Sequence, residues 1–143
     1  MHIKKEILID AKSEKIFQIF SDLERWHQWG GCIIKAMWIS GREWQPESMF
    51  LQTVRGFGMI KKFDSKVKIL ESEPCKKVTW TGTRKLINGT HTFEFKGIGN
   101  KTKVSNFENF RGILAPVLFP LFKNNFEIYF EQFLEGLKKE AEK

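Results

Sequence analysis

Residues 116–142 read PVLFPLFKNNFEIYFEQFLEGLKKEAE, and this stretch decides how the rest of the chain must fold. Its large apolar side chains recur at steps of three and four from Phe119 to Leu137, while Glu127, Glu131 and Glu135 fall on the other face. That spacing predicts an amphipathic helix. At 1.5 Å per residue such a helix is about 40 Å long, which exceeds the length of an ordinary strand. We therefore expect a curved sheet to wrap around it.

The residues ahead of this helix are dominated by alternation of apolar and polar side chains, which predicts β-strands. Each break between alternating segments contains Gly, Pro or Asn, so the connections are short and the sheet should be antiparallel. A first strand covers residues 2–10. The six further predicted strands are Cys32–Ser40, Ser48–Arg55, Met59–Glu73, Lys77–Lys85, Gly89–Gly97 and Lys101–Arg111.

Two short helices are predicted between the first and second strands. Ser13 and the pair Ser21-Asp22 offer N-caps, and Gly30-Gly31 ends the second helix. The predicted fold class is therefore α+β. It consists of a seven-stranded curved antiparallel sheet wrapped around a long C-terminal helix, with two short helices after the first strand.

The composition is that of one globular domain, and we expect residues 1–143 to form a single unit. The chain has 143 residues, of which 41% are hydrophobic and 29% charged. A chain of this length builds a core without disulfide or metal staples, so we expect Cys32 and Cys75 to be reduced thiols. The three histidines are scattered and no CxxC pair occurs. We therefore expect no metal and no cofactor.

The sequence carries no pattern of secretion or membrane insertion. Its N-terminus begins directly with an alternating segment, without a basic region followed by an apolar core. The longest nearly apolar run, Gly112–Phe122, is interrupted by prolines. It is also shorter than the roughly 18 residues that a spanning helix needs. We expect a cytoplasmic protein with no integral membrane segment, and we leave its oligomeric state open.

The net charge of +7 raises the question of nucleic-acid binding. The chain has neither a basic helix nor an aromatic and glycine-rich RNA-binding signature. The paired basic residues lie on different predicted strands, at Lys4-Lys5, Lys61-Lys62, Lys76-Lys77 and Arg84-Lys85. A solvated outer face accounts for them, so we expect no nucleic-acid partner.

Aromatic residues are unusually frequent, with 14 Phe, 5 Trp and 1 Tyr. Bulky rings often line a space that flexible aliphatic chains would fill, although an aromatic-rich core gives the same count. Strand parity points Trp80, His91 and Phe93 inward. It also groups Asn106 with Glu108 on one face of the last strand, which we take as inward, although a bulge would turn it to solvent. The residues that we expect to line an internal pocket are Trp38, Trp80, His91, Phe93, Asn106, Glu108, Phe122, Phe126 and Phe130.

His91 is the obvious candidate for acid–base work, because it points inward and its ordinary pKa lies near neutrality. A lone inward histidine is more often a satisfied polar group, and spacing identifies no nucleophile or carboxylate partner for it. We therefore assign no catalytic residue. We expect His91, with Glu108 or Asn106, to contact the polar end of a ligand.

Three segments carry a resemblance to a known superfamily. Residues 9–29, IDAKSEKIFQIFSDLERWHQW, resemble the opening signature of START-like (SRPBCC) domains. Residues 88–95, NGTHTFEF, and 106–112, NFENFRG, resemble the polyketide cyclase/dehydrase-like branch. The predicted order of elements is that of the Bet v 1-like helix-grip fold. One departure is Pro46-Glu47-Ser48, where related sequences often have Gly, so the mouth of a pocket there has a different shape.

The resemblance implies a cavity between the sheet and the long helix. We expect this cavity to bind a small hydrophobic ligand, lipid or polyketide-like. The alternative is a polyketide cyclase or aromatase that uses the same cavity, since such catalysis rests largely on positioning. A weaker alternative is a cochaperone-like domain that binds proteins through the outer face of the sheet.

Overall fold

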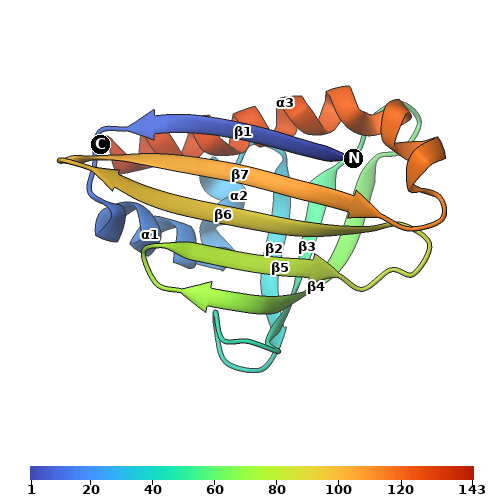
Figure 1. Cartoon of the computed structure of the whole chain (residues 1–143), viewed down its shortest axis with the longest axis horizontal. Coiled ribbons are helices and arrows are strands. Elements are labelled where there is room, and N and C mark those ends of the chain that lie inside the picture. The colour runs from blue at the N-terminus through green and yellow to red at the C-terminus, as the bar shows by residue number, and fades with distance from the viewer.

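In the structure, a computed structural model that describes all residues from 1 to 143, a seven-stranded sheet curves around one long helix (Figure 1). All neighbouring strands are antiparallel, in the order β1-β7-β6-β5-β4-β3-β2. The strands are β1 (His2–Ile9), β2 (Ile33–Ser40), β3 (Met49–Arg55), β4 (Lys62–Glu73), β5 (Lys77–Gly82), β6 (Asn88–Ile98) and β7 (Lys101–Arg111). The predicted α+β fold is confirmed. The long helix α3 (Ala115–Ala141) begins and ends one residue before the predicted bounds.

Two strands, β4 and β5, are each three residues shorter than predicted, and both leave a loop at the same end of the sheet. β4 begins at Lys62 and not at Met59, because residues 56–61 close a tight loop in which the backbone N–H of Gly56 donates to Lys61 O at 2.9 Å. β5 ends at Gly82 and not at Lys85, and its pairing with β6 stops at Thr81. Loops 56–61 and 83–87 therefore stand beside the start of α3 (Figure 1).

The short helical segments after β1 are α1 (Ser13–Ser21), a single 3-10 turn η1 (Leu23–Arg25) and α2 (Trp26–Trp29). The predicted capping is wrong in detail, because Lys12 and not Ser13 occupies the N-cap of α1. No side chain caps either α1 or η1. Tertiary packing holds these segments, and the indole N–H of the buried Trp26 donates to Phe20 O at 2.7 Å. Gly31, at φ 63°, takes the left-handed backbone that turns the chain into β2.

The inward faces of the sheet follow the predicted parity. Val78 and Phe93 are buried, with exposed fractions of 0% and 2%. β7 pairs with β6 without a register shift, so Glu108 lies opposite His91 and Asn106 opposite Phe93. β7 therefore has no bulge against β6 that would turn Asn106 and Glu108 to solvent. A main core of 22 buried residues fills the space between the sheet, the short helices and the second half of α3.

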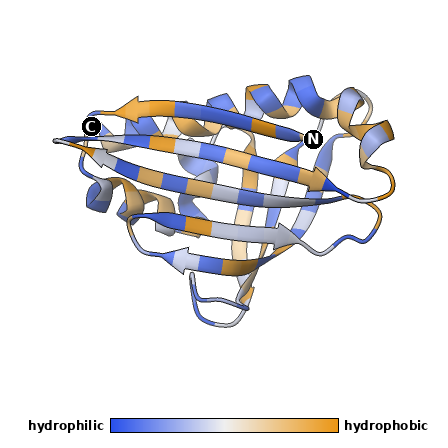
Figure 2. Ribbon diagram, viewed as in Figure 1, coloured by the Kyte–Doolittle hydropathy of each residue, from blue (hydrophilic) through white to orange (hydrophobic).

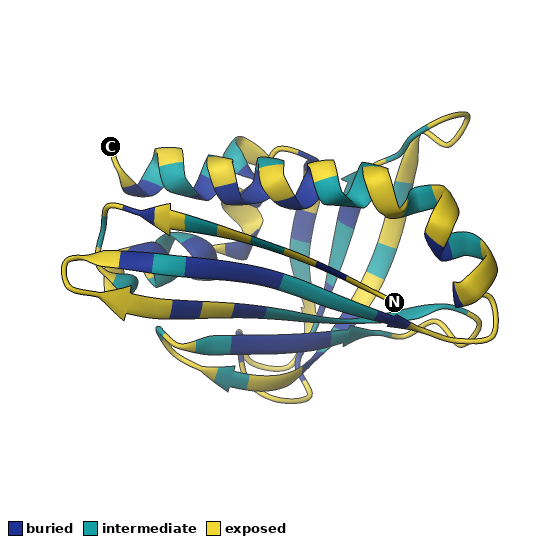
Figure 3. Ribbon diagram, turned by 45° about the horizontal axis from the view of Figure 1, so that its top comes forward, coloured by how far each residue is buried: buried dark blue, intermediate teal, exposed yellow.

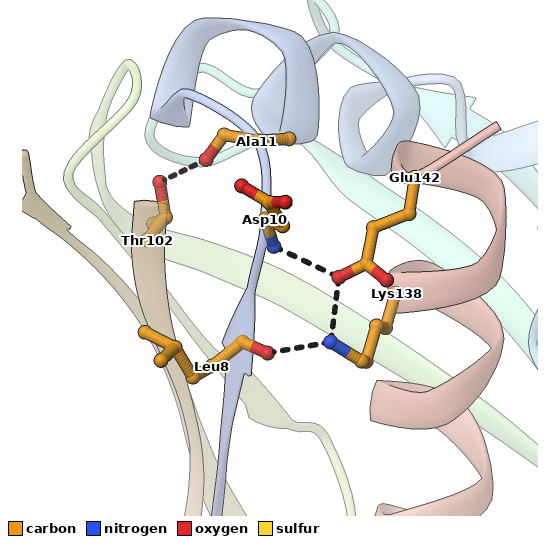
Figure 4. Close-up of polar contacts among 6 residues, drawn as sticks. All are labelled: Leu8, Asp10, Ala11, Thr102, Lys138 and Glu142. Carbon is orange, nitrogen blue, oxygen red and sulfur yellow. Dashed lines mark hydrogen bonds and ion pairs between the residues drawn. The ribbon is translucent and has the colours of Figure 1, made fainter. Parts of the chain in front are cut away.

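The C-terminal end of α3 is tied to the sheet by polar contacts at the end of β1 (Figure 4). Lys138 Nζ donates to Leu8 O at 2.9 Å and pairs with Glu142 Oε2 at 2.5 Å. The same carboxylate oxygen accepts from the backbone N–H of Asp10 at 2.8 Å. The face of α3 that meets the sheet is buried along these turns (Figure 3). These contacts fix the C-terminal end of α3 on the sheet. The N-terminal end of α3 lies next to loops 56–61 and 83–87 (Figure 1).

The first turns of α3 bend relative to the rest of the helix (Figure 1). Pro120 lies inside the helix. Proline removes one backbone hydrogen bond and its ring clashes with the preceding turn, which kinks a helix. No helix of the structure is both long and apolar enough to span a bilayer.

Gly136 allows α3 to approach α2 closely. A larger residue at this position should therefore destabilise the fold. A Cβ added there would lie 1.8 Å from Trp29 O. We expect Gly136→Ala to lower the free energy of unfolding by about 1 to 3 kcal/mol through overpacking, although alanine is the better helix former. Urea denaturation measures this change. Gly97→Ala is the control, since a Cβ there meets nothing within 4 Å. A Gly136→Ala variant as stable as the wild type would show that the helices separate without cost.

Candidate functional site

A cavity of about 440 Å³ lies between the inner face of the sheet and α3. This volume is within the range of small-molecule sites, roughly 300 to 1,000 Å³. Of its 29 lining residues, 19 are hydrophobic. The structure brings together eight of the nine residues predicted for a pocket. They are Trp80, His91, Phe93, Asn106, Glu108, Phe122, Phe126 and Phe130.

Trp38 does not line the cavity, contrary to the prediction. The residue of β2 that lines the cavity is Ile33, the first residue of the strand. Trp38 lies five residues further on, which is about 16 Å along a strand. There it packs edge-on against Trp44 and Phe50, with ring centroids 5.1 and 5.5 Å apart. Trp38 therefore belongs to the packed core between β2 and β3 and not to the cavity wall.

His91 is held in a fixed orientation by the aromatic rings around it. Its ring stacks on Phe93 and on Phe130, with centroids 5.0 Å apart in both pairs and interplanar angles of 10° and 25°. The Nε2 atom of His91 donates to Oδ1 of Asn106, which is itself 1% exposed. The Nδ1 atom is left unprotonated and lies 3.4 Å from Glu108 Oε2.

Glu108 is the unusual group in this wall. Its side chain is 18% exposed and that of His91 is 12% exposed, and both line the cavity. Burial raises the pKa of Glu108 to about 8. Burial also lowers the pKa of His91 to about 4, against an opposing effect of the hydrogen bond to Asn106. Both groups are therefore uncharged at neutral pH, and the wall presents a neutral carboxyl beside a neutral imidazole.

Two residues close to Glu108 that shape this wall were missed by the sequence prediction. Gly89 gives Glu108 its room, because a Cβ there would lie 2.1 Å from Glu108 Oε1. Asn88 lines the cavity, and its buried Oδ1 has no hydrogen-bond partner. The predicted strand begins at Gly89, and the structure extends β6 by one residue to Asn88. The strand register could have identified Gly89. A two-residue turn at 99–100 pairs Gly89 with Phe110, which brings Gly89 close to Glu108.

The cavity extends to the end of the molecule where the two loops meet α3. Ile60, Arg84 and Leu121 line it there, and each is exposed. Loop 56–61 is held to the helix by Tyr129, whose hydroxyl donates to Gly56 O at 2.7 Å. We call this end the mouth.

The remaining titratable groups of the cavity give no second reactive centre. Burial raises the pKa of the Cys32 thiol to about 12, so the thiol is uncharged and a poor nucleophile at neutral pH. Cys32 and Cys75 are both free. No group of three or more His, Cys, Asp or Glu side chains lies close enough to hold a metal ion.

The fold recurs in solved structures of low sequence identity. A START superfamily protein from Mycobacterium smegmatis is 16% identical, with a TM-score of 0.80, over 99% of this chain and 97% of that chain. The Zhui aromatase/cyclase from Streptomyces sp. R1128 is 11% identical, with a TM-score of 0.79, over 99% of this chain and 93% of that chain. Ginseng major latex-like protein 151 from Panax ginseng is 9% identical, with a TM-score of 0.82, over 99% and 97%. At these identities the likeness shows the fold alone.

The sequence itself gives a more specific result. Among curated proteins, none matches the chain. Residues 1–142 match the family described as polyketide cyclase / dehydrase and lipid transport. This match covers the strands that build the cavity wall and the helix that closes it. The START-like resemblance of the sequence is thus confirmed, and the chain belongs to the polyketide cyclase/dehydrase and lipid-transport family.

Proposed function

We propose that the cavity binds a small hydrophobic molecule whose polar end is a neutral carbonyl or hydroxyl group. The observation that carries this proposal is the uncharged pair of His91 and Glu108 in a wall that is otherwise mainly apolar. Apolar walls supply affinity, and a few placed polar groups supply orientation. A ligand carboxylate would enter a water-poor site that offers it no adjacent cation from this pair, which is costly.

The residues around the pair have separate roles. Asn106 and the stacked rings of Phe93 and Phe130 orient His91, because they contact its ring and its Nε2 atom. Glu108 presents its carboxyl to the ligand, in the space that Gly89 leaves. Phe122 and Phe126 contact the apolar body of the ligand from α3. The free acceptor of Asn88 serves a ligand hydroxyl closer to the mouth.

A cyclase- or aromatase-type enzyme on a polyketide-like substrate is the second candidate. The observation that favours it is the raised pKa of Glu108, about 8, because a general acid or base works best when its pKa lies near the working pH. Turnover of such a substrate that Glu108→Gln abolishes, with binding unchanged, would establish the enzyme.

Replacing His91 by alanine tests the binding role. We expect a neutral fluorescent probe, N-phenyl-1-naphthylamine, to bind the protein. A long-chain methyl ketone should displace it at lower concentration than the fatty carboxylate of equal chain length. His91→Ala should weaken binding of the corresponding long-chain alcohol by roughly 5- to 100-fold, because the alcohol hydroxyl loses Nδ1 of His91 as its hydrogen-bond acceptor. His27→Ala, at an exposed position, is the control.

Circular dichroism of both variants should match that of the wild type, so that a change in binding is not a change in folding. The proposal is wrong if His91→Ala binds the long-chain alcohol as tightly as the wild type. It is equally wrong if the carboxylate is the better competitor at neutral pH.

A further inference from the structure

The mouth of the cavity is built from three segments that are distant in the sequence. They are residues 56–63, 82–90 and 111–126, and together we call them the mouth rim. The backbone N–H of Leu114 donates to Leu86 O at 3.0 Å, which joins the second and third segments. Ile60, Arg84 and Leu121 line one continuous cavity and join all three. All three segments lie at the same end of the molecule in Figure 1.

Large apolar side chains are exposed on the mouth rim. Of the fourteen large hydrophobic residues that are exposed in the whole chain, seven lie there. Met59 is fully exposed at the tip of its loop, at 101%. Ile113 lies just before α3, Val117 and Leu121 follow it at steps of four on the first turns of the helix, and the three are 66% to 78% exposed. Figure 2 shows apolar residues gathered on these turns. Clusters of this kind mark interaction surfaces in otherwise soluble folds.

The charge of the mouth rim has one sign. Its three segments contain no Asp or Glu. Their basic residues are Lys61, Lys62, Arg84, Lys85, Arg111 and Lys123. These six account for most of the chain's net charge of +7. The carboxylates that adjoin these segments in the chain are Asp64, which accepts a hydrogen bond from Thr53 at 2.7 Å, and Glu127, which pairs with Lys123 at 3.8 Å.

We propose that the mouth rim docks on an anionic phospholipid membrane surface. Exposed apolar side chains flanked by basic residues are the pattern of interfacial membrane binding. The apolar groups enter the boundary of the acyl chains, and the cations meet the headgroups. The contact places the mouth of the cavity against the lipid phase. This inference goes beyond ligand binding and does not depend on what occupies the cavity.

Vesicle co-sedimentation of the full chain tests the docking. We expect binding to vesicles of phosphatidylcholine with one third phosphatidylglycerol, and about tenfold or more weaker binding to phosphatidylcholine alone. The double variant Lys61→Gln, Lys62→Gln should bind anionic vesicles about 20-fold more weakly, since each basic residue near the surface contributes roughly fivefold. Lys96→Gln, Lys101→Gln is the matched control. It removes the same charge at the β6–β7 turn, at the other end of the molecule (Figure 1).

A second pair of variants tests the apolar contribution. Met59→Ser, Leu121→Ser should weaken binding, whereas Leu70→Ser, Ile98→Ser should leave it unchanged, because Leu70 and Ile98 are exposed outside the mouth rim. The proposal fails if the protein does not bind anionic vesicles at low salt, or if rim and control variants bind alike. Light scattering measures the oligomeric state of the wild type and of the rim variants. If the wild type is a dimer that the rim substitutions dissociate, the mouth rim is an interface between two copies of the chain, and the docking proposal is wrong.

Discussion

Raising the pH from 6.5 to about 9 is expected to lower the free energy of unfolding by about 2 kcal/mol, and Glu108→Gln should abolish that loss. The pKa of Glu108 is about 8 in the folded state, against an ordinary value of 4.5. Between these two values the folded protein holds a proton that the unfolded chain releases. Stability therefore falls as the pH rises. Each pKa unit corresponds to about 1.4 kcal/mol, so the whole window amounts to at most about 5 kcal/mol.

His91 produces the opposite slope at lower pH. Its pKa is about 4 in the folded state, against an ordinary value of 6.5. Between these values the unfolded chain binds more protons, so stability rises with pH. The contributions of His91 and Glu108 oppose each other from about pH 4.5 to 6.5. Of these two groups only Glu108 contributes above pH 6.5, and its loss from there to about pH 9 is the expected 2 kcal/mol.

Urea denaturation of the wild type and of Glu108→Gln at a series of pH values measures this difference. Glutamine has the shape of the protonated glutamic acid and does not ionise, so the variant should stay stable above pH 6.5. Glu94→Gln, on the outer face of the neighbouring strand β6 and exposed, should behave like the wild type. A parallel decline of Glu108→Gln and the wild type would show that Glu108 is not held protonated by the fold.

Filling the cavity should remove ligand binding without unfolding the protein. Val54 on β3 lines the cavity and is half-buried. A tryptophan there takes up the space of roughly three methylene groups of a ligand. Each buried methylene group contributes about 0.8 kcal/mol to the binding free energy. We expect Val54→Trp to weaken probe binding by about 60-fold. Fluorescence titration with N-phenyl-1-naphthylamine measures the loss.

Leu51→Trp provides the matched control for this substitution. Leu51 lies on the same strand, does not line the cavity and is also half-buried. Leu51→Trp should bind the probe like the wild type, and both variants should unfold cooperatively in urea. Tight binding by a folded Val54→Trp variant would place the probe outside the cavity.

Periodicity was sufficient to predict the architecture of this chain, and it was less informative about the site. The steps of three and four from Phe119 to Leu137 located α3 to within one residue at each end. Alternation placed His91 and Phe93 on the inner face, because a strand side chain has only two faces to choose from. Position along the strand is a separate quantity, which is why Trp38 was assigned wrongly to the cavity.

The pairing of His91 with Glu108 was within reach of the sequence, whereas its chemistry was not. A two-residue turn at 99–100 sets the register of β6 and β7, and this register brings the two side chains opposite each other. Their opposite pKa shifts depend on how deeply the folded chain buries each side chain, which no local pattern shows. The mouth rim was missed for a similar reason, since three distant segments form it.

Native mass spectrometry of the protein as purified tests most directly whether the cavity holds a hydrophobic ligand. We expect the wild type and Leu51→Trp to carry a bound nonpolar compound, either retained from the cells or taken up when a long-chain methyl ketone is added. Val54→Trp should carry none under the same conditions. Binding in the cavity would be contradicted by a wild type that takes up no such compound, or by equal occupancy in Val54→Trp and the wild type.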